Sequence, residues 1–189
     1  MLWATDFFTT DVWTLGGLVT YDILFLIHLE TRQVHIAGVT AQPNEIWMKQ
    51  MVRNLTMDEW GMLKPGQYLI HDRDTKFCAA FKQMLDQAGV KRVPLSPRLP
   101  WLNAYAERWI QSIKTEVLSR MILFGERSLR HALSEYVAHH HTERPHQGKG
   151  NVILFPAAKV EPDWDSSIEC RERPVGCATT ITARPHNRL

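Results

Sequence analysis

Three acidic residues occupy positions where a carboxylate can do chemistry. Asp6 interrupts the apolar run of residues 2–8, and Asp72 directly follows the short apolar run of residues 67–71. A buried carboxylate costs several kcal/mol unless it is paired or bound to a metal. Hard oxygen ligands held close together suit Mg²⁺ or Mn²⁺ rather than zinc. For either aspartate alone, a turn or helix N-cap residue is an equally ordinary interpretation.

The third acidic residue, Glu107, is selected by helical geometry. At about 100° per residue, one apolar stripe of the helix expected over residues 103–121 comprises Ala106, Ile110, Ile113, Val117 and Met121. Glu107 lies along one edge of that stripe, where a carboxylate can reach a site on the sheet. Glu116 lies roughly 180° away on the same geometry. The spacing therefore favours Glu107 over Glu116.

The rest of the pattern supplies the elements that would position these residues. Strands are expected over residues 2–8, 21–29, 33–39, 67–71 and 90–95, and helices over 45–60, 75–88, 103–121 and 128–141. This order predicts a mixed α/β layer architecture. If the first and fourth strands are neighbours, Asp6 and Asp72 converge. Residues 1–150 form the expected core, and residues 151–189 a poorly structured tail without apolar periodicity.

Composition excludes several classes of protein. With 44% hydrophobic and 22% charged residues, the 189-residue chain has the composition of one globular domain, not of a disordered protein. The net charge of +2 does not by itself indicate nucleic acid, although residues 91–120 hold six basic side chains against two acidic ones. Three cysteines without a CxxC pair, no signal-peptide pattern and no apolar run long enough to span a membrane predict a cytoplasmic protein.

Two aromatic features leave alternatives open. The run His139–His141, together with His146, resembles a metal-ligand set, but structural zinc sites usually space their ligands and no cysteine is near. Contact with a DNA backbone or an ordinary surface position is the alternative for these histidines. Trp101 either stacks on a base in the loop before the helix of Glu107 or packs in the core.

Four sequence blocks together resemble a known family. They are Thr5–Thr9 (TDFFT), His71–Phe77 (HDRDTKF), Asn103–Arg108 (NAYAER) and Glu143–Gly148 (ERPHQG). The first three resemble the signature blocks of the retroviral-integrase-type catalytic core, which retroviral integrases share with many bacterial insertion-sequence transposases. The fourth resembles the Arg-Pro-His motif that follows the core in the bacterial branch. The match runs from about residue 2 to residue 150.

The resemblance implies a ribonuclease H-like fold, a mixed five-stranded sheet flanked by helices. It also implies that Asp6, Asp72 and Glu107 are an acidic (DDE) triad holding two Mg²⁺ or Mn²⁺ ions for in-line attack on a DNA phosphodiester. Water would cut the element's end, and the freed 3′-hydroxyl would join that end to target DNA. Asp74 is the rival of Asp72, but the family pattern places the metal ligand first in its block.

The same resemblance implies partners. They are DNA, as element ends and as target, and further copies of the chain in a homo-oligomer. The residues expected to meet DNA are Arg98, Asn103, Arg108, Gln111, Lys114, Arg144 and His146. For Lys114, a solvated helical position is the alternative.

The ends of the chain suggest a truncated strand transferase. The first catalytic strand begins at the second residue, so no upstream segment would recognise the element's ends. Residues 174–189 lack a packing pattern, which a frameshift near Pro174 would explain. Two further interpretations stay open: a ribonuclease H-like nuclease that cuts without joining, and a non-catalytic remnant that only binds DNA or dimerises.

Overall fold

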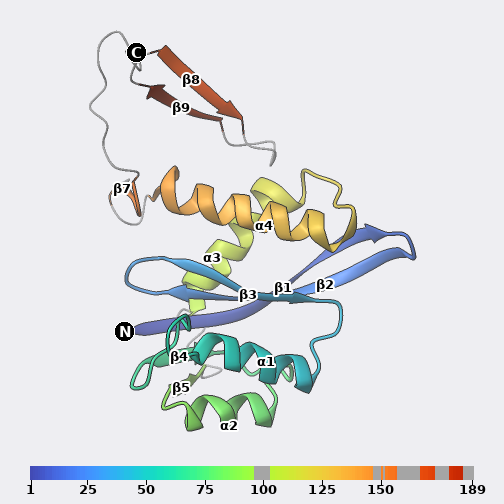
Figure 1. Ribbon diagram of the computed structural model, residues 1–189, viewed down its shortest axis with the longest axis vertical. Coiled ribbons are helices and arrows are strands. Elements are labelled where there is room, and N and C mark those ends of the chain that lie inside the picture. Colours follow the sequence, from blue (N-terminus) through green and yellow to red (C-terminus); the bar gives the residue numbers. More distant parts are fainter. Residues whose placement is uncertain (96–102, 147–149, 151, 157–166, 173–178, 185–189) are drawn as a thin grey trace.

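A five-stranded sheet forms the centre of the computed structural model (Figure 1). The structure describes residues 1–95, 103–146, 150, 152–156, 167–172 and 179–184. The strand order is β3-β2-β1-β4-β5. The bounds are β1 Leu2–Thr14, β2 Gly17–His28, β3 Val34–Thr40, β4 Tyr68–His71 and β5 Lys91–Pro94. The first three strands are antiparallel, whereas β4 and β5 run parallel to β1. The expected neighbourhood of the first and fourth strands is therefore confirmed.

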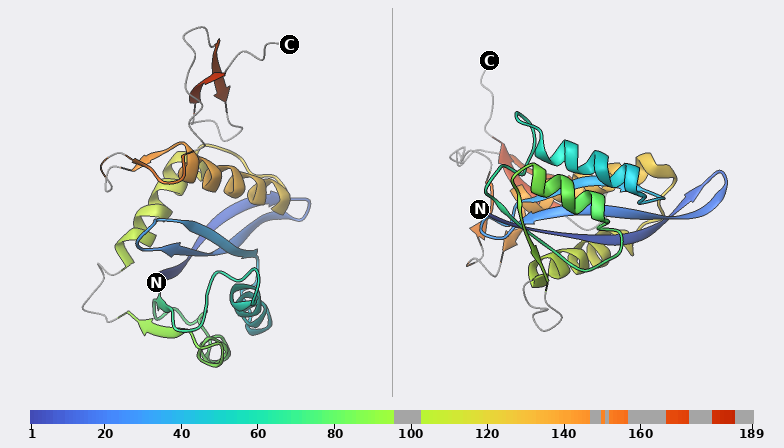
Figure 2. Two further views of the ribbon diagram at one scale, coloured as in Figure 1. Left: turned by 60° about the vertical axis from the view of Figure 1, so that its left-hand side comes forward. Right: turned by 90° about the horizontal axis from the view of Figure 1, so that it is seen from below.

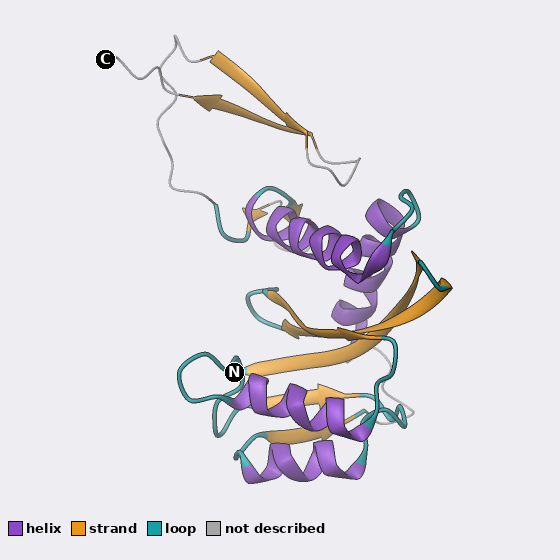
Figure 3. Ribbon diagram, turned by 45° about the vertical axis from the view of Figure 1, so that its right-hand side comes forward, coloured by secondary structure: helices purple, strands orange, loops and turns teal. Residues whose placement is uncertain are grey.

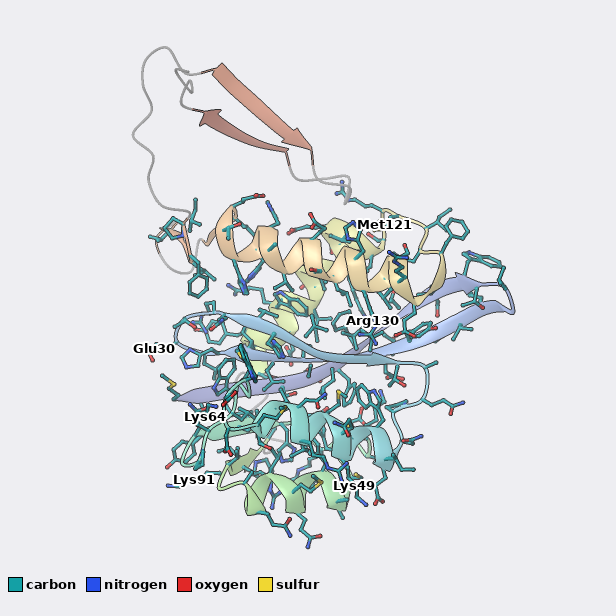
Figure 4. All side chains as sticks on the ribbon, viewed as in Figure 1. Glu30, Lys49, Lys64, Lys91, Met121 and Arg130 are labelled. Atoms are coloured by element: carbon teal, nitrogen blue, oxygen red, sulfur yellow. The ribbon has the colours of Figure 1, made fainter. Side chains whose placement is uncertain are left out.

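Helices cover both faces of the sheet (Figure 3). One face carries α1 (Glu45–Thr56) and α2 (Ala79–Gln87). The other carries α3 (Ala104–Ile113), its π-helical continuation η2 (Lys114–Leu118), and α4 (Gly125–Thr142). Alternate residues of β1 serve the two layers: Trp3 packs with α1 and α2, and Ala4 and Phe8 pack with α3 and α4. Side chains fill the space between the sheet and the helices on both faces (Figure 4). Arg130 of α4 also donates a hydrogen bond to the carbonyl of Val39 in the edge strand β3.

The longest departure from the expected elements is β1, which extends six residues beyond the predicted end at Phe8. Its second half pairs with β2 in a two-stranded ribbon that projects past the helices (Figure 2). Burial alternates along it, with residues 9, 11 and 13 exposed and residues 10, 12 and 14 half-buried or buried. The covered face is mostly threonine, so the sequence shows no alternation of apolar and polar residues. Only Val12 is fully buried there, and the backbone N–H of Trp13 bonds to Leu123.

The helices also differ from their expected bounds. Residues 72–78 form a turn instead of the first turn of a helix, and α1 ends at Thr56. The helix expected over residues 103–121 widens into the π-helical turn after Ile113, and α4 begins earlier, at Gly125. Two short antiparallel pairs follow α4. The first pairs β6 (Pro145–His146) with β7 (Val152–Ile153), and the second pairs β8 (Ser167–Glu172) with β9 (Thr179–Arg184). None of the described helices is both long enough and apolar enough to cross a bilayer.

Candidate active site

Asp6 and Asp72 lie side by side because their strands pair in parallel. Ala4 pairs with Ile70 and Thr5 with His71, so the next step along both strands brings Asp6 beside Asp72. Alternate side chains of a strand share a face, which places Asp6 on the face of Ala4 and Phe8, under α3. Backbone pairing thus fixes two acidic residues that are 66 positions apart in the sequence.

Asp6 has an unusual environment for a carboxylate. Its Oδ1 accepts a hydrogen bond from the backbone N–H of Phe7 at 2.7 Å, and its Oδ2 accepts one from Nδ2 of Asn103 at 2.9 Å. Burial nevertheless raises the pKa of Asp6 to about 6, and the negative charges of Asp72 and Glu107 add to the increase. The three predicted acidic residues are therefore near enough for their charges to interact.

Glu107 and Glu116 have different surroundings on the long helix. Glu107 is exposed and lies one turn beyond Asn103, and its charge acts on Asp6. Glu116 lies in η2, where its Oε1 is 2.6 Å from Nη2 of Arg144 and its Oε2 accepts a hydrogen bond from the hydroxyl of Tyr136 at 3.0 Å. Of these two glutamates, Glu107 is thus the one that can contribute to a site with Asp6.

The turn after β4 separates Asp72 from its rival Asp74. Oδ1 of Asp72 accepts a hydrogen bond from the N–H of Asp74 at 3.0 Å. Asp74 itself accepts one from the N–H of Lys76 at 2.9 Å and lies 3.6 Å from the ammonium of Lys76. That ammonium also lies 2.7 Å from a carboxylate oxygen of Asp22. The charge of Asp72 contributes to the raised pKa of Asp6. Asp74 and Asp22 instead form ion pairs with Lys76, which stabilise the turn.

The residues expected to contact DNA occupy several environments. Arg108, Gln111 and Lys114 are exposed on the helix that carries Glu107. Arg144 is engaged with Glu116 and Tyr136. Arg98 and Trp101 lie outside the described residues, as does the side chain of His146.

Asn103 is the residue whose role the sequence did not indicate. We expected it to contact DNA, but its side chain is 3% exposed and holds Asp6 from 97 residues away. Its position on the same helical edge as Glu107 was visible in the sequence. Contact with Asp6 was not, because it depends on how deeply α3 packs on β1.

The histidine run holds local structure. Nδ1 of His139 lies 2.9 Å from Glu143, and Nε2 of His141 accepts a hydrogen bond from the N–H of Val34 at 2.9 Å. Across the part of the chain that the structure describes, no three His, Cys, Asp or Glu side chains are close enough to hold one metal ion as they stand. This applies to the histidines and to the acidic triad alike.

The acidic site nevertheless has the chemistry of a divalent-cation site. All three carboxylates offer oxygen, the ligand that Mg²⁺ and Mn²⁺ prefer. Within the described residues, the buried Oδ1 of Asn103 has no hydrogen-bond partner beside the Asp6 carboxylate. Burial, with a smaller contribution from the charges of Asp72 and Glu107, raises the pKa of Asp6, and a bound cation would stabilise the ionised form of this carboxylate. These residues therefore fit Mg²⁺ or Mn²⁺, although they need to close on the ion.

Comparisons with known proteins identify the fold. A family model described as "Integrase core domain" matches residues 88–152, about a third of the chain, which include Glu107 but neither aspartate. No curated protein matches the sequence. The catalytic core domain of BIV integrase is 15% identical, with a TM-score of 0.55 over 78% of this chain and 87% of that one. A chain of the simian T-cell lymphotropic virus intasome, in complex with a PP2A regulatory subunit, is 10% identical, with a TM-score of 0.57 over 96% of this chain and 66% of that one. The predicted ribonuclease H-like fold, that of integrase catalytic cores, is confirmed.

Proposed function

We propose that this chain is the catalytic core of a DNA strand transferase that acts in DNA integration or transposition. One observation carries the proposal: Asp6 lies on β1, Asp72 directly follows the adjacent parallel strand β4, and the negative charges of Asp72 and of Glu107 on the covering helix help to raise the pKa of Asp6. The integrase match over residues 88–152 and the integrase fold support it. The proposed triad, Asp6, Asp72 and Glu107, holds two Mg²⁺ or Mn²⁺ ions.

The residues of the chain have separable tasks in the proposed reaction. When bound, the two ions would activate a water or a 3′-hydroxyl and stabilise the leaving oxygen at the DNA phosphodiester. Asp6 is held in the sheet, and Asp72 follows the end of β4, where a hydrogen bond from the N–H of Asp74 holds its carboxylate. Asn103 keeps the Asp6 carboxylate turned toward α3 through its amide hydrogen bond. Glu107 reaches the site from outside the sheet, on an exposed helical edge.

The proposed DNA contacts follow the same helical edge. Arg108, Gln111 and Lys114 are exposed on the helix of Glu107, where they can meet phosphates on either side of the reacting one. From the sequence alone, Arg98, Arg144 and His146 are further candidates, and residues 1–150 are the proposed core. The resemblance to the integrase-type core also implies a homo-oligomer, which would bring together the element ends and the target DNA.

A joining assay tests the function. The 189-residue chain is incubated with pre-nicked element-end DNA, a target plasmid and Mn²⁺. Joined product is expected, and cleavage alone would support a ribonuclease H-like nuclease instead. Absence of any metal-dependent turnover would support the non-catalytic remnant.

A matched pair of variants tests the triad in the same assay. Glu107→Gln should abolish joining, because it removes a carboxylate without changing the size of the side chain. Glu59→Gln, at an exposed position outside the site, should leave joining unchanged. Full joining by Glu107→Gln would refute the assignment of Glu107.

A further inference from the structure

Three side chains close a hydrogen-bonded ring beside the helix of Glu107. The guanidinium of Arg144 contacts both carboxylate oxygens of Glu116, with Nη2 at 2.6 Å from Oε1 and Nη1 at 3.0 Å from Oε2. Nη1 also donates to the hydroxyl of Tyr136 at 2.7 Å, and that hydroxyl donates to Glu116 at 3.0 Å. Burial raises the pKa of Tyr136 well above its usual range, so the hydroxyl remains a donor. The planar fork of Arg144 is occupied by this bidentate contact.

The ring joins three segments that differ in sequence position. Tyr136 belongs to α4, Arg144 follows the end of α4, and Glu116 lies in η2, the continuation of α3. A bond from the N–H of Ser119 to the carbonyl of Lys114, 2.9 Å long, closes the wide π-helical turn around Glu116. Such turns are rare and occur frequently at functional sites. Arg144 thus links α4 to the π-helical turn in the helix that carries Glu107.

Aromatic packing connects the ring with the acidic site. The ring of Tyr136, 2% exposed, lies 6.4 Å from that of Trp109, measured between centroids. Trp109 in turn lies 5.6 Å from Phe8 and 4.5 Å from Phe25. Trp109 is two residues from Glu107, and Phe8 is two residues from Asp6. A continuous set of packed side chains therefore runs from Arg144 through Tyr136 and Trp109 to Phe8, on the strand that carries Asp6.

We propose that Arg144 is a positioning residue: by holding Glu116 and Tyr136, it sets how the helix of Glu107 lies over the strand of Asp6. This inference rests on the proposed function. The arginine of the Arg-Pro-His block would then bind side chains of its own chain and not DNA. The alternative is that Arg144 leaves Glu116 and binds a DNA phosphate.

Kinetics on the full chain distinguish the two roles. If Arg144 positions the helix, then Arg144→Met, Glu116→Gln and Tyr136→Phe should each lower kcat for joining, by about tenfold to a hundredfold for a displacement of about 1 Å. KM for DNA should not change. The double variant Glu116→Gln/Arg144→Met should be no worse than the poorer single variant, because both remove the same contact. Glu126→Gln, which breaks an exposed ion pair with Arg130 on α4, is the matched control and should keep the wild-type kcat.

The opposite results would overturn the inference. A DNA contact by Arg144 predicts a higher KM and a weaker salt dependence for Arg144→Met, with Glu116→Gln unaffected or binding DNA more tightly. Restoration of part of kcat by the charge exchange Glu116→Arg/Arg144→Glu would support positioning. If Arg144→Met fails to fold, as judged by circular dichroism, Glu116→Gln and Tyr136→Phe carry the same test.

A second readout, independent of turnover, is the affinity for Mn²⁺ measured from the electron paramagnetic resonance signal of the free ion. Positioning predicts weaker Mn²⁺ binding in Glu116→Gln, although Glu116 is not a proposed ligand. Wild-type protein that neither joins DNA nor binds Mn²⁺ would refute the proposed function, and this inference with it. Active wild-type protein with an equally active Glu116→Gln variant would refute the inference alone.

Discussion

Removing the charge of Asp6 should stabilise the metal-free protein while abolishing its chemistry. The variant is Asp6→Asn. The amide keeps an oxygen for the N–H of Phe7, and its nitrogen can donate to Oδ1 of Asn103 once that side chain flips. The flip leaves Nδ2 of Asn103 without a partner in place of its Oδ1, so the substitution removes the buried charge without increasing the number of unpaired polar groups.

The expected gain in the free energy of unfolding follows from the pKa of the Asp6 carboxyl. Burial, with the charges of Asp72 and Glu107, raises the pKa of Asp6 from 3.8 to about 6. At about 1.4 kcal/mol per pH unit, this corresponds to about 3 kcal/mol. Because the folded state holds the proton more tightly than the unfolded state, the free energy of unfolding falls as the pH rises from 3.8 through about 6. Asp6→Asn should match the wild type near pH 4 and exceed its stability by about 3 kcal/mol above pH 7.

The assay is urea denaturation in EDTA, followed by circular dichroism at pH values from 4.5 to 7.5. The difference between wild type and variant cancels the titration of every group that does not interact with Asp6. Asp11→Asn, an exposed position on the same strand, controls for the loss of a charge as such. An Asp6→Asn protein that is no more stable than wild type at pH 7.5 would refute the account of Asp6 as a buried, uncompensated charge.

Three further predictions test the site and its support. Mn²⁺ at a hundredfold excess over its Kd should raise the free energy of unfolding of the wild type by about 2.7 kcal/mol, and that of Asp6→Asn by much less. Denaturation with and without EDTA measures this, and equal stabilisation of both would contradict a site at Asp6. In joining assays, Asp72→Asn should be inactive, whereas Asp74→Asn should keep most activity. Its amide oxygen can still accept from the N–H of Lys76, so the variant should lose only the ion pair with the Lys76 ammonium and less than about 1 kcal/mol of stability. The reverse ranking would identify Asp74 as the ligand. Trp109→Ala should cost about 3–5 kcal/mol by emptying the space between Phe8 and Phe25. Urea titration checks the loss, and a cost under 1 kcal/mol would show that the helix is held elsewhere.

The sequence predicted the sheet because burial leaves a strong pattern in its central strands. Residues 23–27 are all buried in β2, and the alternation of Trp3 and Ala4 between two layers follows the pleat. The ribbon beyond Phe8 was missed because its covered face is Thr10, Val12 and Thr14 while Trp13 is exposed, so burial alternates but hydrophobicity does not. The late start of α2 was missed because the carboxylates of Asp72 and Asp74 accept hydrogen bonds from nearby backbone N–H groups. These hydrogen bonds compete with those of a first helical turn.

The site was predictable to the extent that it depends on strand order. Once β1 and β4 are neighbours, Asp6 and Asp72 meet without any information on side-chain packing. The hydrogen bond from Asn103 to Asp6 and the ring of Arg144 depend on how helices settle on the sheet and on a π-helical turn. Helical periodicity cannot foresee that turn, because it changes the period itself.

The parallel pairing of β1 and β4 also affects how this chain can change over evolutionary time. The spacing of the two aspartates belongs to the sheet, so the segment between them can gain or lose residues in its surface turns without moving either carboxylate. Gly66, in the turn before β4, has open space where a side chain would project, and its N–H bonds to the carbonyl of Gly89 at 2.8 Å. Glu107, by contrast, is placed by the packing of α3 on the sheet and not by the pairing of strands. Length variation between the two aspartates of homologues should therefore be concentrated in the turns before β4.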